Sequence, residues 1–350
     1  MFKSVLSLTL AAALGTASFG QTTLTAIPGE AAAAKYASIS QEILRAIEKG
    51  NEYLKSKQNP EGYWAQPSYP ALTALAVTAY MRDPANQGKP VPEYIRKGYD
   101  FILKSQKEDG SIFNRGMSSY NTAVCMMALL AANKEEYAPA ILKGRAYLIK
   151  QQNHFAPDNP YNGGIGYGDK QAPPIADLSN TSLALEAIYY SQKLAKDGKY
   201  GEQPDLDWNA ATEFINRCQQ NPAVNKEPWV SNDKSQLGGF VYRPGVSSAR
   251  DKKSAAFDKA EPPKAYGSMT YAGMQSLIYA NVDKNDPRVK LALKWLENSY
   301  SLDENPGMGV QGLYYYYQAM SKALSAMGID TLTLENGRKV GDRKSTRLNS

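Results

Sequence analysis

Residues 49–64, KGNEYLKSKQNPEGYW, decide the fold of this 350-residue chain. In this stretch a basic residue and a glycine are followed by an aromatic–aliphatic pair, a glutamine and a Gly-x-Trp turn. The order from the basic residue to the glutamine returns with identical spacing in residues 97–106 and 143–152. Residues 214–219 keep the aromatic–aliphatic pair and the glutamine, and residues 295–300 keep only the pair. Self-similarity at a fixed period indicates a repeat protein in which each copy is one supersecondary unit.

Each copy precedes a glycine-containing turn and a second, apolar segment, so the predicted unit is helix, tight turn, helix. Glycine permits the positive φ that the reversal requires, and we expect the glutamine to bond the free carbonyls at the end of the first helix. An aromatic residue covers the corner, where burial contributes about 1.5–3 kcal/mol. The second helices are predicted at Ala71–Met81, Thr122–Ala132, Thr181–Lys193, Thr270–Ala280 and Leu313–Met327. The repeats accordingly lie near residues 41–83, 92–133, 138–195, 207–283 and 287–328.

The two helices of a unit differ in polarity. The first is amphipathic, because residues 47–58 place Ile47, Tyr53 and Leu54 on one face and lysines on the other, as in an outer helix. The second, for example residues 71–81, contains no charged residue and needs partners on every side. Outer and inner layers of this kind predict an all-α fold in which the hairpins close into a ring.

The basic-Gly, aromatic-Leu, Gln, Gly-x-Trp pattern resembles the QW repeat of squalene–hopene cyclases. The wider superfamily includes protein prenyltransferases and the thioester domains of complement-like proteins. The similarity covers residues 41–328. It implies an α/α toroid (barrel) of about six helical hairpin repeats whose inner helices direct their N-termini at a central cavity. Five repeats are present, so the resemblance implies that the last one is truncated.

The resemblance also implies a catalytic motif, Asp-x-Asp-Asp, which opens an inner helix and protonates a polyene. Such a proton donor must be a carboxylic acid that a dry pocket and a second carboxylate keep protonated. In residues 177–180 Asp177 is kept, while Ser179 and Asn180 stand where the two later acids would be. A hydroxyl or an amide is not a strong Brønsted acid, so we do not expect squalene-type cyclisation. Asp177 is the one candidate for a catalytic carboxylate.

The other toroid families also lack their reactive residues here. Prenyl transfer uses a zinc ion held by Asp, Cys and His, but the chain has a single histidine, His154, in a predicted turn. Cys125 and Cys218 lie on helical stretches of different repeats, where two separate buried thiols are expected. The thioester families need a cysteine where Tyr200 begins the sequence YGEQ. We therefore predict no metal site and no cofactor.

The openings of the inner helices are rich in uncharged polar and aromatic residues. Tyrosine combines an apolar face with a hydroxyl group, which suits a small molecule, a glycan, a peptide or an isoprenoid chain. Core packing is the alternative role for the same side chains. The candidate ligand-binding residues are Tyr120, Asn121, Asn180, Tyr271 and Tyr315.

Three functions remain open from the sequence. The first is an exported toroid that binds a ligand or partner in its cavity without cyclase chemistry. The second is an enzyme, either a divergent terpenoid cyclase or a toroid that acts on polysaccharide with Asp177 as its carboxylate. The third is a structural repeat protein of the cell envelope.

Both ends of the chain lie outside the repeats. Residues 1–20 combine Lys3, a short apolar run and small residues before Gln21, which is typical of a secretory signal peptide. We therefore expect an exported protein, periplasmic or secreted, and we find no stretch long enough for a transmembrane segment. Residues 341–350 lack an apolar period, and we expect them to be a sequencing or cloning artefact. The repeat domain is predicted over residues 21–340.

The net charge gives little support for a nucleic-acid partner. It is +6 for the whole chain, and it falls to +3 when the four basic residues and one acidic residue of the two ends are left out. No block of Lys and Arg occurs on a predicted helix, so no nucleic-acid binding is expected. The oligomeric state stays open.

Overall fold

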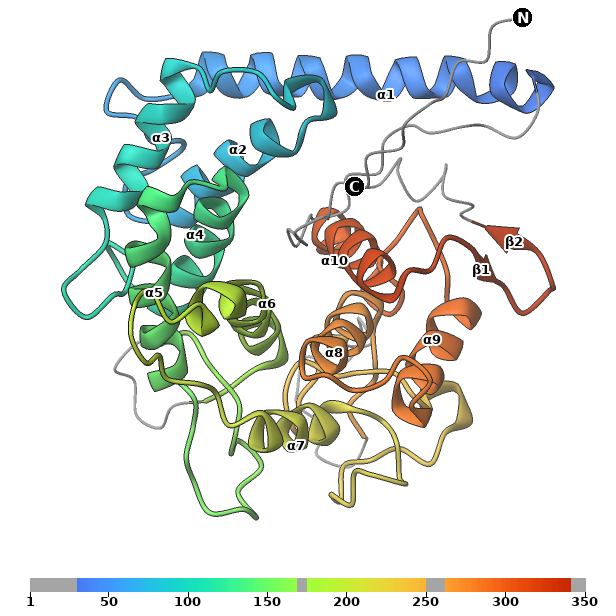
Figure 1. Cartoon of the computed structure of the whole chain (residues 1–350). Coiled ribbons are helices and arrows are strands. Elements are labelled where there is room, and N and C mark those ends of the chain that lie inside the picture. Colours follow the sequence, from blue (N-terminus) through green and yellow to red (C-terminus); the bar gives the residue numbers. More distant parts are fainter. Residues whose placement is uncertain (1–29, 169–174, 250–261, 341–350) are drawn as a thin grey trace, which may run out of the picture.

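The computed structural model describes residues 30–168, 175–249 and 262–340 (Figure 1). The predicted signal peptide and the predicted artefact at residues 341–350 lie outside these ranges. Within them the fold is all-α apart from one small antiparallel pair of strands, β1 (Leu332–Thr333) and β2 (Lys339–Val340). The α-helices are α1 (Glu30–Lys57), α2 (Pro70–Arg82), α3 (Glu93–Lys104), α4 (Ser118–Ala132), α5 (Ala138–Lys150), α6 (Leu178–Lys196), α7 (Trp208–Cys218), α8 (Gly267–Tyr279), α9 (Pro287–Asn298) and α10 (Leu313–Met327). Short 3₁₀ turns are η1 (Pro84–Asn86), η2 (Glu135–Tyr137) and η3 (Lys234–Gln236).

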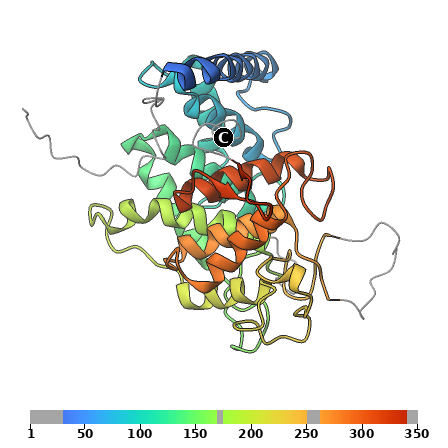
Figure 2. The same ribbon diagram turned by 90° about the vertical axis from the view of Figure 1, so that its right-hand side faces the viewer.

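The helices of the described ranges form five consecutive hairpins, from α1–α2 to α9–α10. In Figure 1, α2, α4, α6, α8 and α10 follow one another along the inner side of a curve, and each packs against the next. Helices α3, α5, α7 and α9 lie on the outer side, and α1 crosses one end. Figure 2 shows α6, α8 and α10 side-on and roughly parallel. The protein therefore has an inner and an outer layer of helices.

All five predicted second helices are present, and they begin at or up to four residues before their predicted starts. The difference arises because the repeat threonine lies inside the first turn. Thr122 Oγ1 donates to the carbonyl of Ser118 (2.7 Å) and accepts the backbone N–H of Ile112 from the preceding turn (2.8 Å). The same contact from the turn backbone is made to Thr73, Thr181 and Thr270.

The repeat glutamine does not bond the end of its own helix, and that prediction was wrong. Gln106 Nε2 donates to the carbonyl of Gly110 (3.1 Å) and to the carbonyl of Ala140 (2.8 Å) in the first turn of α5. The carbonyl of Leu103 at the end of α3 accepts the backbone N–H of Gln106 instead (3.1 Å). The side chain thus connects its own turn to the outer helix of the next hairpin. The same double contact links Gln58 to Gly62 and Tyr94, Gln152 to Gly163 and Asp207, and Gln219 to Gly238 and Arg288; we call these four side chains the glutamine staples.

The turn glycine is required by the same close approach of the next hairpin. Gly110 has a φ of +91°, and a Cβ atom at this position would lie 2.2 Å from the carbonyl oxygen of Lys143 in α5. The predicted positive φ is confirmed, and the contact with the next outer helix is a second reason for glycine. An aromatic residue is not needed at the corner, because aliphatic residues are equally buried there. The residue two positions after the glycine is buried in four repeats: Trp64, Ile112, Ile165 and Phe240.

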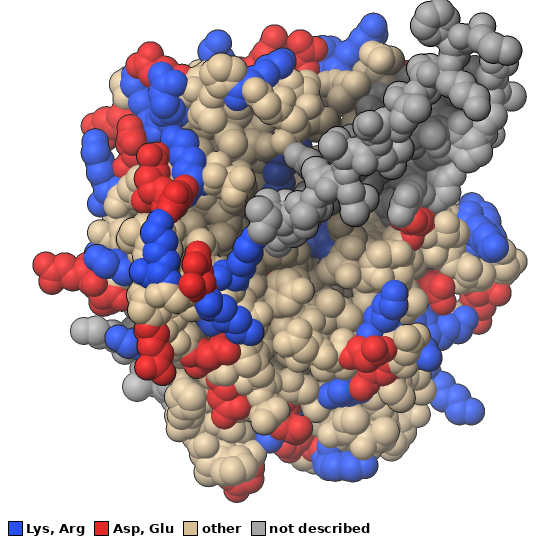
Figure 3. All heavy atoms as spheres, in the orientation of Figure 1, with Lys and Arg blue, Asp and Glu red and all other residues tan. Residues whose placement is uncertain are grey.

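The outer helices face solvent, and in Figure 3 acidic and basic side chains are mixed along the edge of the molecule over α3 and α5. Tyr53 of α1 departs from the prediction that it shares a buried face with Leu54, because its side chain is 62% exposed. Tyr147, at the same place in the third repeat, is buried and donates to Ser118 Oγ of the preceding hairpin (2.7 Å). Within the described residues no hairpin precedes α1, so Tyr53 has no such cover.

Candidate functional site

A cavity of 220 Å³ lies between four of the five inner helices. Each of these helices contributes three side chains, and helices of the first and last hairpins both take part. The lining residues are Leu75, Thr78 and Arg82 of α2; Tyr120, Val124 and Met127 of α4; Ser179, Leu183 and Glu186 of α6; and Tyr315, Gln318 and Lys322 of α10. The cavity is partly open to solvent, and two of its lining residues, Leu75 (40% exposed) and Arg82, are exposed.

The lining residues of each helix are three or four positions apart, so they form one stripe along one face. Leu75, Val124 and Leu183 each follow the threonine of their repeat by two residues, and the next member of each stripe follows it by five. Each inner helix follows an outer helix and a turn of the same kind, so equal places in the repeat lie at similar depth. A stripe that spans seven residues is about 10 Å long.

Hydroxyl groups line the N-terminal end of the cavity. The hydroxyls of Ser179 and Tyr315 are 3.1 Å apart, and Tyr120 lies at the matching place on α4. Burial raises the pKa of Tyr315 to about 12 and also raises the pKa of Tyr120. Both phenols therefore stay neutral near pH 7 and offer hydrogen bonds without charge. The structure places these two predicted ligand-binding residues, Tyr120 and Tyr315, on the cavity wall.

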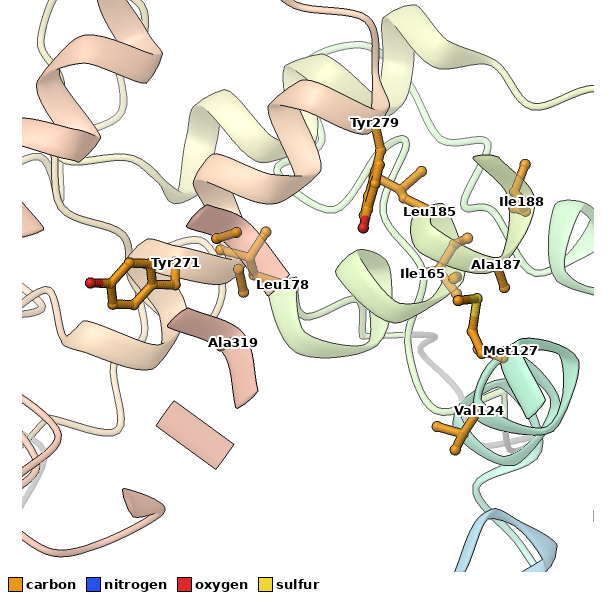
Figure 4. Packing of buried hydrophobic residues seen from close by; sticks show 14 of the residues in the cluster. Val124, Met127, Ile165, Leu178, Leu185, Ala187, Ile188, Tyr271, Tyr279 and Ala319 are labelled. Atoms are coloured by element: carbon orange, nitrogen blue, oxygen red, sulfur yellow. The ribbon is translucent and has the colours of Figure 1, made fainter. Parts of the chain in front are cut away.

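Apolar side chains form the middle of the cavity. Leu75, Leu183 and Val124 come from three different helices at the same place in the repeat, and Met127 lies one turn beyond Val124 (Figure 4). This apolar belt leaves room for an apolar group of a bound molecule between the hydroxyl end and the opposite end of the cavity.

Charged side chains line the opposite end. Lys322 Nζ donates to Glu186 Oε2 at 2.8 Å, with the lysine side chain 20% exposed and the glutamate side chain 3% exposed. Arg82 lies one turn beyond Thr78 on α2 and is exposed. We did not predict these three residues. Glu186 and Lys322 interrupt otherwise uncharged stretches of inner helices, and that interruption was the available signal.

Asp177 lies outside the cavity wall, at the N-terminus of α6. Its Oδ1 atom accepts the backbone N–H of Asn180 (2.8 Å) and its Oδ2 atom accepts the side-chain amide of Asn180 (2.7 Å). Asp177 is therefore the N-cap of α6. Burial raises the pKa of Asp177 to about 6, although hydrogen bonds from Asn180 and Tyr242 oppose the rise. A catalytic role for this carboxyl group stays a prediction.

The other predicted ligand-binding residues, Asn121, Asn180 and Tyr271, lie in the core. Asn121 Oδ1 accepts the backbone N–H of Ala71 at the start of α2 (3.0 Å), so it joins two hairpins. It follows a cavity residue in sequence, but one residue turns a helix by about 100° and carries the side chain away. Tyr271 belongs to α8, which contributes no lining residue; its ring points away from Leu178 (Figure 4) and packs 5.7 Å from that of Tyr316.

Metal-ligating and thiol groups do not gather at the cavity. Among the residues that the structure describes, no group of three or more His, Cys, Asp or Glu side chains comes together to hold a metal ion. Cys125 and Cys218 are free and buried, which confirms the prediction of two separate thiols, and burial raises the pKa of both. His154 is exposed in a loop, as predicted. None of the helices in the three described ranges has the length and apolarity of a membrane span.

A scan of the sequence against models of known protein families finds no match. The resemblance to squalene–hopene cyclases therefore stays a prediction from the repeat motif of the sequence.

Proposed function

We propose that this protein is an exported, divergent relative of the squalene–hopene cyclases that binds a small molecule in its central cavity and lacks cyclase chemistry. The observation that carries the proposal is the cavity, into which four inner helices each direct three side chains. Four helices turn the same kind of face, with residues three or four positions apart, toward this one space, and that arrangement favours a role for it.

A closed α/α toroid is part of this proposal. Helix α2 belongs to the first hairpin and α10 to the last, yet side chains of both line the same cavity. An open solenoid, whose repeats contact only their neighbours, would keep its two ends apart. The meeting of the ends therefore supports a ring, and export rests on the pattern of residues 1–20.

The cavity favours a small ligand over a long polyene. An apolar cavity of about 150 Å³ holds one benzene molecule, so 220 Å³ is too small for a triterpene chain. Among the described residues Glu186 is the one acid at the cavity wall, and it is paired with Lys322. Both oxygens of Asp177 accept hydrogen bonds from Asn180.

A polysaccharide-acting enzyme is also less well supported than a binding protein. Glycoside hydrolysis requires two carboxyl groups that flank the scissile bond, usually about 5–10 Å apart. The cavity wall supplies only Glu186 among the described residues, and its charge is already matched by a lysine.

Two leucine substitutions with similar exposure test the binding function. Leu75→Trp places a larger ring in the cavity at a position that is 40% exposed, so the packed core need not expand. Leu302→Trp makes the same change at a position that is 43% exposed and outside the cavity wall.

We expect molecules of about ten non-hydrogen atoms to bind the wild type and Leu302→Trp, and Leu75→Trp to lose them, in ligand-observed NMR. Equal binding by both variants would show that the cavity is not the site. Consumption of a bound molecule that stops in Asp177→Asn would replace the binding function with an enzymatic one.

A further inference from the structure

Three hydroxyl groups from three inner helices converge at the N-terminal end of the cavity. Ser179 of α6, Tyr315 of α10 and Tyr120 of α4 line this end, and each side chain is half-buried. The hydroxyl oxygens of Ser179 and Tyr315 are 3.1 Å apart. Each hydroxyl carries one proton, so the hydrogen bond between them uses one O–H group and leaves the other unused among the described residues. The hydroxyl end therefore keeps a donor and several lone pairs for a ligand.

The same end disfavours a charged group. Burial raises the pKa of Tyr315 to about 12, and the nearby Tyr120 phenol adds to the rise. Burial also raises the pKa of Tyr120. Surroundings that keep these phenols neutral also penalise a charge on a bound molecule. At the opposite end the Glu186 carboxylate already has Lys322 as its counterion, at 2.8 Å, so no ligand cation is needed to neutralise it.

We propose that the cavity selects a small uncharged molecule with one hydroxyl group on an apolar body, bound with its hydroxyl among Ser179, Tyr315 and Tyr120. This inference rests on the proposed ligand-binding function and names the class of ligand. A hydroxyl group both donates and accepts hydrogen bonds. It can therefore accept the unused O–H of the Ser179–Tyr315 pair and donate to another oxygen of the wall. The apolar belt of the cavity contacts the rest of the molecule.

The test compares two probes that differ in this one group. p-Cresol and p-xylene have the same ring and the same number of non-hydrogen atoms, and p-cresol bears a hydroxyl where p-xylene bears a second methyl. We expect p-cresol to bind the full chain about fivefold more tightly in ligand-observed NMR, because two hydrogen bonds outweigh the burial of one methyl group. Tyr315→Phe and Ser179→Ala should each lower the ratio of the two affinities about fivefold, through the loss of one hydrogen bond.

The neighbouring variant Tyr314→Phe is the matched control. Tyr314 precedes Tyr315 on α10, is 86% exposed and lies outside the cavity wall, so the same change there should leave the ratio as it is in the wild type. Tyr120→Phe should lower the ratio as well, and it keeps the test informative even if Ser179→Ala, in the first turn of α6, does not fold.

Two results would overturn the selection of a hydroxyl group and leave the binding function intact. One is a wild type that binds p-xylene as tightly as p-cresol, or more tightly, with both probes lost in Leu75→Trp. The other is a ratio that neither Tyr315→Phe nor Tyr120→Phe changes. Failure of both probes to bind the wild type would overturn the binding function together with this inference.

Discussion

Each glutamine staple should stabilise the fold through the hydrogen bonds that join its turn to the next hairpin, and Gln152 provides the clearest test. Its side chain is 4% exposed and takes part in three hydrogen bonds. Nε2 donates to the carbonyls of Gly163 (3.1 Å) and Asp207 (2.9 Å), and Oε1 accepts the backbone N–H of Asp207 (3.0 Å). Gln152→Met keeps the length of the side chain and removes all three bonds.

At about 1 kcal/mol for each bond, we expect Gln152→Met to lower the free energy of unfolding by about 3 kcal/mol. For a protein of this size the thermal midpoint should fall by roughly 6–10 °C. Denaturant and thermal unfolding followed by circular dichroism measure both quantities. The neighbouring variant Gln151→Met is the matched control, since the Gln151 side chain is half-buried and has no hydrogen bond within the described residues.

The contacts of Gln152 also predict which backbone amides lose protection from hydrogen exchange when this side chain is replaced. Because Asp207 gives its N–H to Gln152, the amide hydrogens at the start of α7 should exchange faster in Gln152→Met and not in Gln151→Met. Mass spectrometry of exchanged peptides across residues 205–212 resolves this. Equal stability losses in the two variants, or unchanged exchange at α7, would refute the assignment of the glutamine as the link between hairpins.

Three further predictions concern other parts of the fold. The pKa of Asp177 is about 6 against an ordinary value of 3.8, so the folded state binds the proton more tightly and the wild type should lose about 3 kcal/mol of stability between pH 4 and 7. Asp177→Asn, which can still cap the helix, should remove this loss. If the free energy of unfolding fell equally with pH in the two proteins, the burial argument would be contradicted. Gly110→Ala should destabilise by more than about 2 kcal/mol, since its Cβ would lie 2.2 Å from a backbone oxygen at a φ of +91°. Gly50→Ala, in open space on a helix, should stabilise by up to about 1 kcal/mol. A thermal midpoint that Gly110→Ala leaves unchanged or raises would show that glycine is not needed at the turn. The two buried thiols should not react with a thiol reagent in the native protein and should both react in denaturant; rapid reaction of either in the native protein would argue against its burial.

The hairpins could be predicted because the residues that build their turns repeat. Gln106, Gly110 and Thr122 each form a hydrogen bond or a close contact with the backbone of a neighbouring segment. Each of these contacts requires one residue type at its position. The partners of the glutamine could not be predicted, because Ala140 lies 34 residues away and becomes a neighbour only when two hairpins stack.

The cavity was predicted less well than the hairpins. Tyr120 and Tyr315 were found because tyrosine at a helix opening suggests a ligand, and the same argument selected Tyr271, which faces the core. The face of an apolar helix that borders the cavity is decided by how four helices meet. Composition does not reveal that face when every side of the helix is apolar.

The positions that hold the fold and the positions that face the cavity are separate, and this separation explains why the repeat says little about chemistry. Four repeats keep glutamine at the staple, whereas the place five residues after the threonine is occupied by Thr78, Met127 and Glu186 in successive inner helices. A buried charge at such a place is costly unless another helix supplies the opposite charge. Lys322 supplies it from 136 residues away, so a charged residue that departs from an apolar repeat, together with its distant partner, is the sequence signal that points to the cavity.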